Sequence, residues 1–153
     1  MFDSAYGESE EGRTGLSDEI AGVLRGQREF YATGATKDPD FRLAALQRLQ
    51  EGINARQGEL AEAVRADLGK SRAEFFMSES ALVLAEIRQH QKLLARWMRP
   101  QKVRTSILHF IGRSYVVSEP YGQSLIISPW NYPFNLTFIP LVGALSAGNT
   151  AIV

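Results

Sequence analysis

The sequence predicts an α/β chain, in which helices come first, a β-hairpin follows, and the first β-α-β unit of a parallel sheet comes last. Three observations predict this class. Apolar residues recur at helical spacing through residues 16–102. Residues 103–120 change to short strand-like runs around a glycine. Residues 121–153 contain no charged side chain, as expected for strands that are buried on both faces.

Length and composition limit what this chain can be. Its 153 residues are enough for one domain with a core and too few to expect two. Its 17 acidic and 17 basic residues balance, so charge gives no reason to expect a nucleic acid or an anionic membrane as partner. Cysteine is absent, which excludes a disulfide, a zinc-thiolate site and a thiol nucleophile within these residues.

The beginning of the chain, residues 1–15, is polar and mostly acidic in its charges. We expect it to be a disordered leader, because it has too little apolar surface to form a core. It lacks the basic and apolar regions of a secretory signal, so a cytosolic (cytoplasmic) location is the default expectation. A helix should follow and end at Gly34, a residue that tolerates the left-handed conformation.

Capping residues divide the rest of the helical part. Asp38 and Pro39 are suited to cap and begin the next helix. We expect one long amphipathic helix after them, ended by Gly69 in the left-handed conformation. Ser71 and Glu74 form a capping box for a further helix. The predicted apolar line of that helix is Met77, Ala81, Leu84, Ile87, Leu94 and Met98.

A hairpin is predicted next, with strands Thr105–Ile111 and Ser114–Ser118 joined near Gly112. Basic residues outnumber acidic ones just before it, between Glu86 and Arg104. A solvated helix face accounts for this excess, because like charges along a surface helix need no partner. A binding surface is the alternative.

The uncharged segment 121–153 allows two interpretations. It is long enough to span a membrane, which takes about 20 predominantly apolar residues. Its prolines and asparagines would leave polar groups unpaired in lipid, so we expect no membrane span. We expect instead a buried strand, a proline-bounded loop, a short apolar helix and a second strand, at Ser124–Ser128, 129–137, Phe138–Ala147 and from Thr150 onward. Because that last strand has barely begun at Val153, we expect the chain to be interrupted there.

Three motifs do not support a site. The run Gly143–Thr150 is one residue short of a phosphate-binding loop and carries Asn149 where a lysine belongs. The glycosylation sequon at Asn135 lies in an apolar context without a secretory signal. Neither His90 nor His109 has a metal-ligating residue three or four positions after it, so no metal site is predicted.

The candidate site lies in the segment Ile126–Phe134. Asn131 follows a predicted buried strand and lies between Pro129 and Pro133, where α/β folds place ligands. Its amide can donate to a developing oxyanion without titrating. The two prolines would stiffen the loop before a substrate arrives. The alternative is that Asn131 only satisfies backbone groups of a turn.

Longer motifs favour the first interpretation. The run Pro129–Leu136, followed by Pro140–Asn149, resembles the aldehyde dehydrogenase superfamily. Its tyrosine and its Asn-Leu pair are similar to the class 3 (fatty and aromatic aldehyde) branch, as are Asp67–Ser71 and Ser118–Gly122. The resemblance covers roughly residues 24–153 and implies the N-terminal part of a longer enzyme.

The resemblance also implies a reaction. Such enzymes use NAD or NADP to oxidise an aldehyde to a carboxylic acid, through a cysteine thiolate, a hydride transfer to the nicotinamide and a glutamate that activates water. Asn131 matches the asparagine that stabilises the oxyanion. The positions that match the lining of the cofactor cleft are Ile127, Ser128, Pro129 and Trp130.

The same resemblance implies a division of the chain. Residues 16–102 would be the helical part of a Rossmann-like cofactor domain, whose sheet starts in residues 121–153. Residues 103–120 match a bridging hairpin through which subunits associate, which implies a homodimer of the full-length enzyme.

The family's catalytic cysteine and glutamate have no counterpart in these 153 residues, so we expect the isolated chain to be inactive. An alternative of another class is a non-catalytic helical module for interaction or oligomerisation. A third is a truncated chain that folds only against a missing half.

Overall fold

The computed structural model describes residues 10–106 and 111–153. Its helices are α1 (Glu10–Ala32), α2 (Pro39–Ala55), α3 (Gln57–Leu68), α4 (Arg72–Phe75), α5 (Ala81–Trp97) and α6 (Pro133–Ala147). A 3-10 turn, η1 (Ala35–Lys37), and a π-helical turn, η2 (Phe76–Ser80), lie between them. The strands are β1 (Gln101–Val103), β2 (Ser114–Val116), β3 (Gln123–Leu125) and β4 (Thr150–Ile152). These elements fit the predicted α/β class.

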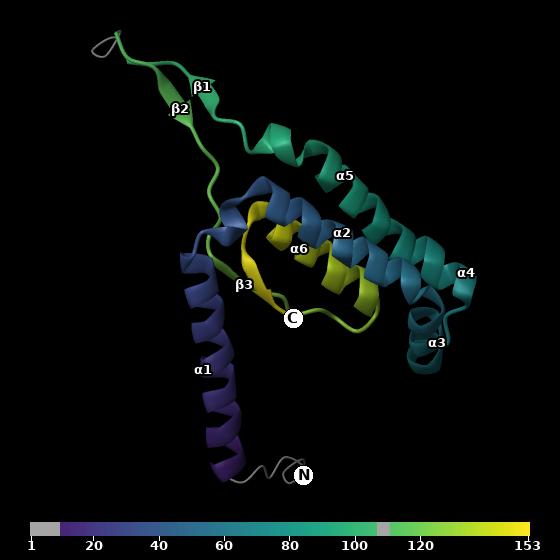
Figure 1. Ribbon diagram of the computed structural model, residues 1–153. Coiled ribbons are helices and arrows are strands. Elements are labelled where there is room, and N and C mark those ends of the chain that lie inside the picture. Colours follow the sequence, from purple (N-terminus) through teal and green to yellow (C-terminus); the bar gives the residue numbers. More distant parts are fainter. Residues whose placement is uncertain (1–9, 107–110) are drawn as a thin grey trace.

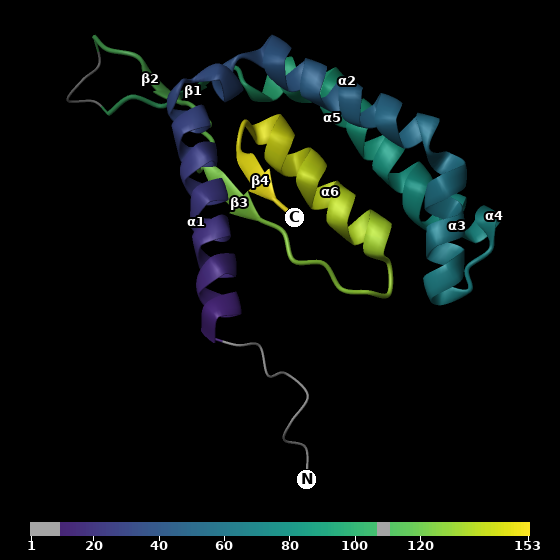
Figure 2. The ribbon, with the colours of Figure 1, turned by 60° about the horizontal axis from the view of Figure 1, so that its bottom comes forward.

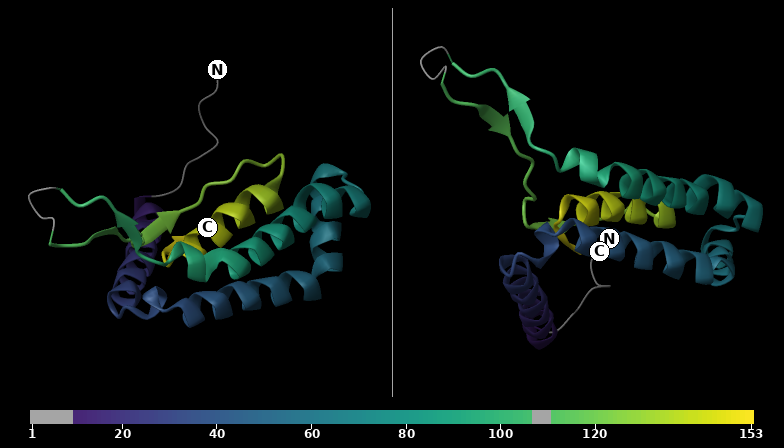
Figure 3. Two further views of the ribbon diagram at one scale, coloured as in Figure 1. Left: turned by 90° about the horizontal axis from the view of Figure 1, so that it is seen from above. Right: turned by 45° about the horizontal axis from the view of Figure 1, so that its top comes forward.

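The core lies between helices α2, α5 and α6 and also takes in residues of α3 and α4. Helices α2, α5 and α6 run side by side and contact one another (Figure 1). Helix α3 and the short α4 close one end of this layer, and the β1–β2 hairpin projects from the other end (Figure 3). The core residues are Leu46, Ile53, Ala61, Val64, Phe75, Val83, Leu84, Ile87, Phe134 and Val142.

The predicted caps are present. The Asp38 carboxylate accepts a hydrogen bond of 2.9 Å from the Asp40 amide at the start of α2. Gly34 and Gly69 have φ values of 78° and 69°, in the left-handed region. The Ser71 hydroxyl accepts from the Glu74 amide at 3.2 Å, which is one half of the predicted capping box. Caps depend on neighbours in sequence, which is why local rules predict them well.

The prediction of a single long helix after Asp38 is wrong, because the helix is interrupted at Arg56, which separates α2 from α3. Arg56 has φ −113° and ψ 17°, and its amide bonds to the Ile53 carbonyl, three residues back. The break changes the direction of the chain, so that Ala61 and Val64 of α3 join the same core as Ile53 of α2. Burial of this second apolar face favours the break over a straight helix.

The next helix also differs from its prediction. Its first turns are α4 and the π-helical η2, and the extra residue of a π turn rotates the face that follows. Phe75, Glu79 and Val83 are therefore buried, whereas Met77 of the predicted apolar line is 67% exposed.

The hairpin is displaced from its predicted position. β1 is antiparallel to β2, and Val103 lies opposite Ser114. The first strand thus ends before the predicted Thr105–Ile111, although the second agrees in part. A segment with strand propensity forms a strand only where it pairs with another strand. Here β2 pairs with Gln101–Val103 and not with the residues predicted to form the first strand. Residues 107–110, which include His109, lie outside the described residues.

The C-terminal part contains β3, α6 and β4 in this order. β3 and β4 pair in parallel, with Gln123 opposite Thr150, and the Ile126 amide extends the pairing to the Ile152 carbonyl at 2.9 Å. Helix α6 starts earlier than predicted, at Pro133. Proline is favourable at the first helical position, because the backbone amide that it lacks would have no partner within the helix there. The strands were expected to be buried on both faces, yet Leu125 is 68% exposed.

Helix α1 lies against this small sheet on the side away from α6 (Figure 2). The Gln27 amide donates to the Ala151 carbonyl at 2.8 Å, and the Tyr31 hydroxyl donates to the Pro120 carbonyl at 3.1 Å. The predicted leader is wrong for residues 10–15, because α1 begins at Glu10. Residues 1–9 lie outside the described residues. In the described part of the chain, no helix combines the length and the apolar character needed to cross a membrane.

The turn after α6 gives a test of the packing. Gly148 has φ 89°, and a Cβ there would lie 2.5 Å from the Arg42 guanidinium and 2.7 Å from the Thr36 carbonyl oxygen. Gly148→Ala should therefore lower the free energy of unfolding by about 1–3 kcal/mol, measured by urea denaturation. The control is Gly143→Ala in α6, where a Cβ meets nothing within 4 Å. It should be neutral or stabilising by up to about 1 kcal/mol, and equal losses in both variants would contradict this packing.

Candidate functional site

The loop between β3 and α6 is bound by a buried ion pair, which Lys70 and Glu79 form. The Lys70 ammonium lies 2.7 Å from one carboxylate oxygen of Glu79, and the side chains are 10% and 0% exposed. The same ammonium donates to the backbone carbonyl of Asn131 at 2.8 Å. Lys70 follows the glycine that ends α3, and Glu79 lies in η2. Lys70 and Glu79, which are close in sequence, thus form a contact with Asn131, which lies much later in the chain.

The second carboxylate oxygen of Glu79 caps helix α6. It accepts hydrogen bonds from the backbone amides of Phe134 at 2.8 Å and Asn135 at 3.2 Å. The first amides of a helix have no partner within the helix, and the partial positive charge there favours an anion. Tyr132, the residue before α6, supplies no side-chain cap, so Glu79 does this from a distant element.

Two further contacts join the same elements. The Lys70 ammonium lies 3.8 Å from the centroid of the Tyr132 ring, a cation–π geometry. The Asn135 side-chain amide donates to the Ser78 carbonyl at 3.2 Å. The segment 131–135 is therefore attached at one end to Lys70 and at the other end to η2.

The structure brings the predicted site residues together on this loop. The Asn131 side chain is exposed, whereas its carbonyl is bound by Lys70. Ile127 and Trp130 are 84% and 87% exposed, and Pro129 is exposed as well. Ser128 is turned toward the start of α6, where its hydroxyl accepts from Thr137 at 2.7 Å and donates to the Leu136 carbonyl at 3.3 Å.

Sequence reasoning missed Lys70 and Glu79. The sequence motifs include Lys70 only as part of the Asp67–Ser71 run, and they do not include Glu79. A signal was available for Glu79: it lies four residues after Phe75 and four before Val83, both apolar, so it falls on the buried face of its helix. A carboxylate in that position needs buried donors.

The chemistry open to this arrangement is hydrogen bonding rather than proton transfer or metal binding. Lys70 and Glu79 neutralise each other, and Asn131 carries an amide that does not titrate. Within residues 10–106 and 111–153, no group of three His, Cys, Asp or Glu side chains is placed to hold a metal ion. The exposed part of the site is a donor group on a fixed loop at the carboxyl end of β3.

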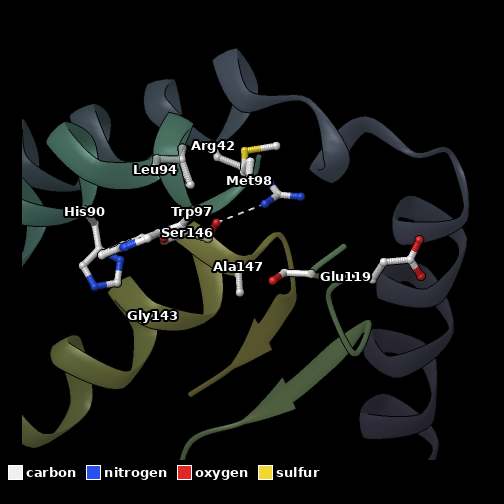
Figure 4. A pocket seen from close by; sticks show the side chains of 10 residues that line it. Arg42, His90, Leu94, Trp97, Met98, Glu119, Gly143, Ser146 and Ala147 are labelled. Carbon is white, nitrogen blue, oxygen red and sulfur yellow. Dashed lines mark hydrogen bonds between the residues drawn. The ribbon is translucent and has the colours of Figure 1, made fainter. Parts of the chain in front are cut away.

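A cavity of about 250 Å³ lies elsewhere, at the other end of α5 and α6 (Figure 4). Arg42 borders it, donates to the Thr36 carbonyl at 2.6 Å and donates to the Ser146 carbonyl at 3.2 Å. Burial lowers the pKa of Arg42 from its ordinary value. His90 also borders the cavity, with one ring nitrogen 3.0 Å from the Glu86 carboxylate. No residue of the Asn131 loop lines this cavity.

Comparison with known proteins places the chain in a family. The sequence profile of the aldehyde dehydrogenase family matches residues 18–153. The chain is 41% identical over 126 residues to a 4,4'-diaponeurosporen-aldehyde dehydrogenase of Staphylococcus aureus, which covers 82% of this chain and 28% of that protein. It is 38% identical over 136 residues to aldehyde dehydrogenase family 3 member B1 of Rattus norvegicus. This match covers 89% of this chain and 29% of that protein.

A solved structure agrees with this placement. The substrate-bound state of the Staphylococcus aureus enzyme AldH superposes with a TM-score of 0.84 at 39% identity, over 86% of this chain and 29% of that one. The chain belongs to the aldehyde dehydrogenase family, and its similarity to family 3 proteins confirms the class 3 resemblance. It spans less than a third of the length of these relatives.

The aromatic residues beneath the loop give a stability test. Phe134 is 5% exposed, and its ring lies 5.4 Å from that of Phe75 and 4.4 Å from that of Phe138, centroid to centroid. Phe134→Ala should lower the free energy of unfolding by about 3–5 kcal/mol in urea denaturation, since it leaves a cavity in the core. The control is Phe76→Ala, because Phe76 is 52% exposed, and its cost should be about 1 kcal/mol or less. Equal costs would show that Phe134 is not a core residue.

Proposed function

We propose that this chain supplies the oxyanion donor and one wall of the cofactor site of an NAD(P)-dependent aldehyde dehydrogenase that oxidises aldehydes to carboxylic acids. The observation that carries the proposal is the exposed Asn131 side chain on a loop whose backbone is fixed by a buried ion pair. Family membership supports the reaction, and the resemblance of the motifs to the class 3 branch implies fatty or aromatic aldehydes as substrates.

Asn131 would act on the charge that forms at the carbonyl. When a nucleophile attacks an aldehyde, the carbonyl oxygen becomes negative, and an amide N–H can donate to it. The amide is neutral in every step, so it needs no proton exchange with solvent. Because the loop is already held in place, the donor does not have to be ordered when the charge appears. One such donor is typically worth about 2.7–4 kcal/mol in the transition state.

The loop also fits one side of a dinucleotide site. Ile127 and Trp130 offer exposed apolar surface at the carboxyl end of a parallel strand, where α/β folds bind such ligands. We assign them, with Ser128 and Pro129, to the wall of the cofactor cleft. NAD or NADP, when bound, supplies the hydride acceptor. The parallel pairing of β3 and β4 around α6 supports the assignment of residues 121–153 to the start of a Rossmann-like sheet.

The catalytic parts of the site would come from outside these residues. The sequence contains no cysteine, so it cannot supply the thiolate that the family's reaction requires. We therefore propose that the 153-residue chain does not turn over aldehydes by itself. The non-catalytic module considered as an alternative is not favoured by the family membership.

The hairpin supports a second part of the proposal, that the full-length enzyme is a homodimer. The β1–β2 hairpin projects from the helices, and Tyr115, Val116 and Val117 on it are 50–55% exposed. Apolar side chains on a projecting ribbon are suited to contact another subunit. A cytoplasmic location stays a prediction.

The role of Asn131 can be tested in a chimera. Residues 18–153 would replace the matching segment of the Staphylococcus aureus 4,4'-diaponeurosporen-aldehyde dehydrogenase, 41% identical to this chain. In this chimera, Asn131→Ala should lower kcat by about 100- to 1,000-fold, because it removes one oxyanion donor. NADH or NADPH formation from 4,4'-diaponeurosporen-aldehyde or a medium-chain aldehyde is the measurement.

The matched control is Asn54→Ala, since Asn54 is an exposed asparagine on α2 away from the loop. It should leave kcat unchanged. The unmodified 153-residue chain, assayed alone, should form no reduced cofactor above blank. An Asn131→Ala chimera with the parent's kcat would refute the oxyanion role, and turnover by the isolated chain would refute its proposed inactivity.

A further inference from the structure

We infer that Lys70 and Glu79 are positioning residues for Asn131, and that the reaction rate depends on them although neither reaches the substrate. The inference rests on the proposed function, because it concerns how the oxyanion donor is aimed. It assigns a role in the reaction to two buried charged groups that the oxyanion chemistry itself does not use.

The ion pair holds the loop on both sides of the donor. Lys70 binds the carbonyl of Asn131 at 2.8 Å, and Glu79 binds the amides of Phe134 and Asn135 at 2.8 and 3.2 Å. The short backbone between these anchors has little freedom left. The direction of the Asn131 side chain is set by that backbone, so the pair determines where the amide points.

The hydrogen-bonding groups of both Lys70 and Glu79 are occupied by these contacts. An ammonium has three N–H donors, and the Lys70 group meets Glu79, the Asn131 carbonyl and the face of Tyr132. The two oxygens of Glu79 accept from Lys70 and from the start of α6. Burial of two charges is costly unless such contacts compensate it, and these contacts converge on the loop.

The burial of Lys70 and Glu79 fits a positioning role and not a catalytic one. Glu79 is completely buried and the Lys70 side chain is 10% exposed, so neither is available to a reacting atom. Asn131, in contrast, is exposed. The prolines of the loop restrict single φ angles but do not tie the loop to the helices. The ion pair therefore provides the attachment that prolines cannot.

Loss of the ion pair should therefore lower the reaction rate. Misplacement of a catalytic group by about 1 Å can cost on the order of 100-fold in rate. Lys70→Met removes the ammonium but keeps a flexible side chain of similar length, so in the chimera it should lower kcat by about 10- to 100-fold. The KM for NAD or NADP should change by about twofold or less, because the exposed side chains of the cofactor wall remain in place.

The decisive test is a double-mutant cycle in the chimera with Lys70→Met, Asn131→Ala and both together. If Lys70 acts through Asn131, adding Lys70→Met to Asn131→Ala should cost no more than about twofold further. A merely structural role predicts that the two losses multiply, and that result would overturn the inference. The matched control is Arg72→Met, which removes the exposed Arg72–Glu62 ion pair nearby and should leave kcat unchanged.

Two results keep this inference apart from the proposed function. If Asn131→Ala leaves kcat unchanged, the oxyanion proposal fails. If Asn131→Ala collapses kcat while a folded Lys70→Met chimera keeps the parent's kcat, only the positioning role fails. Should Lys70→Met not fold, Lys70→Arg keeps the charge and alters the geometry, and the same cycle applies to it. Equal kcat in Lys70→Arg and parent, with Glu79→Gln equally active, would then contradict the inference.

Discussion

The buried pair of Lys70 and Glu79 is the interaction on which the arrangement of this chain depends. A carboxylate with no exposure to solvent is strongly unfavourable unless a cation and hydrogen-bond donors surround it. Glu79 meets this requirement with one ammonium and two backbone amides. Because these donors come from the end of α3 and the start of α6, the need to satisfy one side chain fixes the relative positions of three segments.

Local features of the helical part bring the pair together. Gly69 ends α3 in the left-handed conformation, so the chain turns and Lys70 points inward instead of continuing a solvent-exposed helix. The π-helical turn η2 then places Glu79 on the same buried face as Phe75. π turns of this kind are frequent at functional sites, because they change the direction of a side chain without ending a helix. Here the redirected side chain caps α6.

Sequence reasoning reached much of this fold because many of its determinants are local. Asp38 and Gly69 act on residues within one turn, and the Asn131 loop is marked by its own prolines and by the family resemblance. The misses concern contacts between distant segments. The break at Arg56 depends on the burial of α3 against the core. The position of β1 depends on which residues face β2, and the role of Glu79 depends on a helix that begins more than fifty residues later along the chain.

Amide hydrogen exchange of this chain tests most directly whether Glu79 holds the start of α6. First-turn amides of a helix normally exchange rapidly, as expected for Gly58 and Glu59 of α3, which has no side-chain cap. If Glu79 caps α6, the amides of Phe134 and Asn135 should exchange on the order of tenfold more slowly than those of Gly58 and Glu59, after correction for intrinsic rates. Equal exchange at the two helix starts would contradict it.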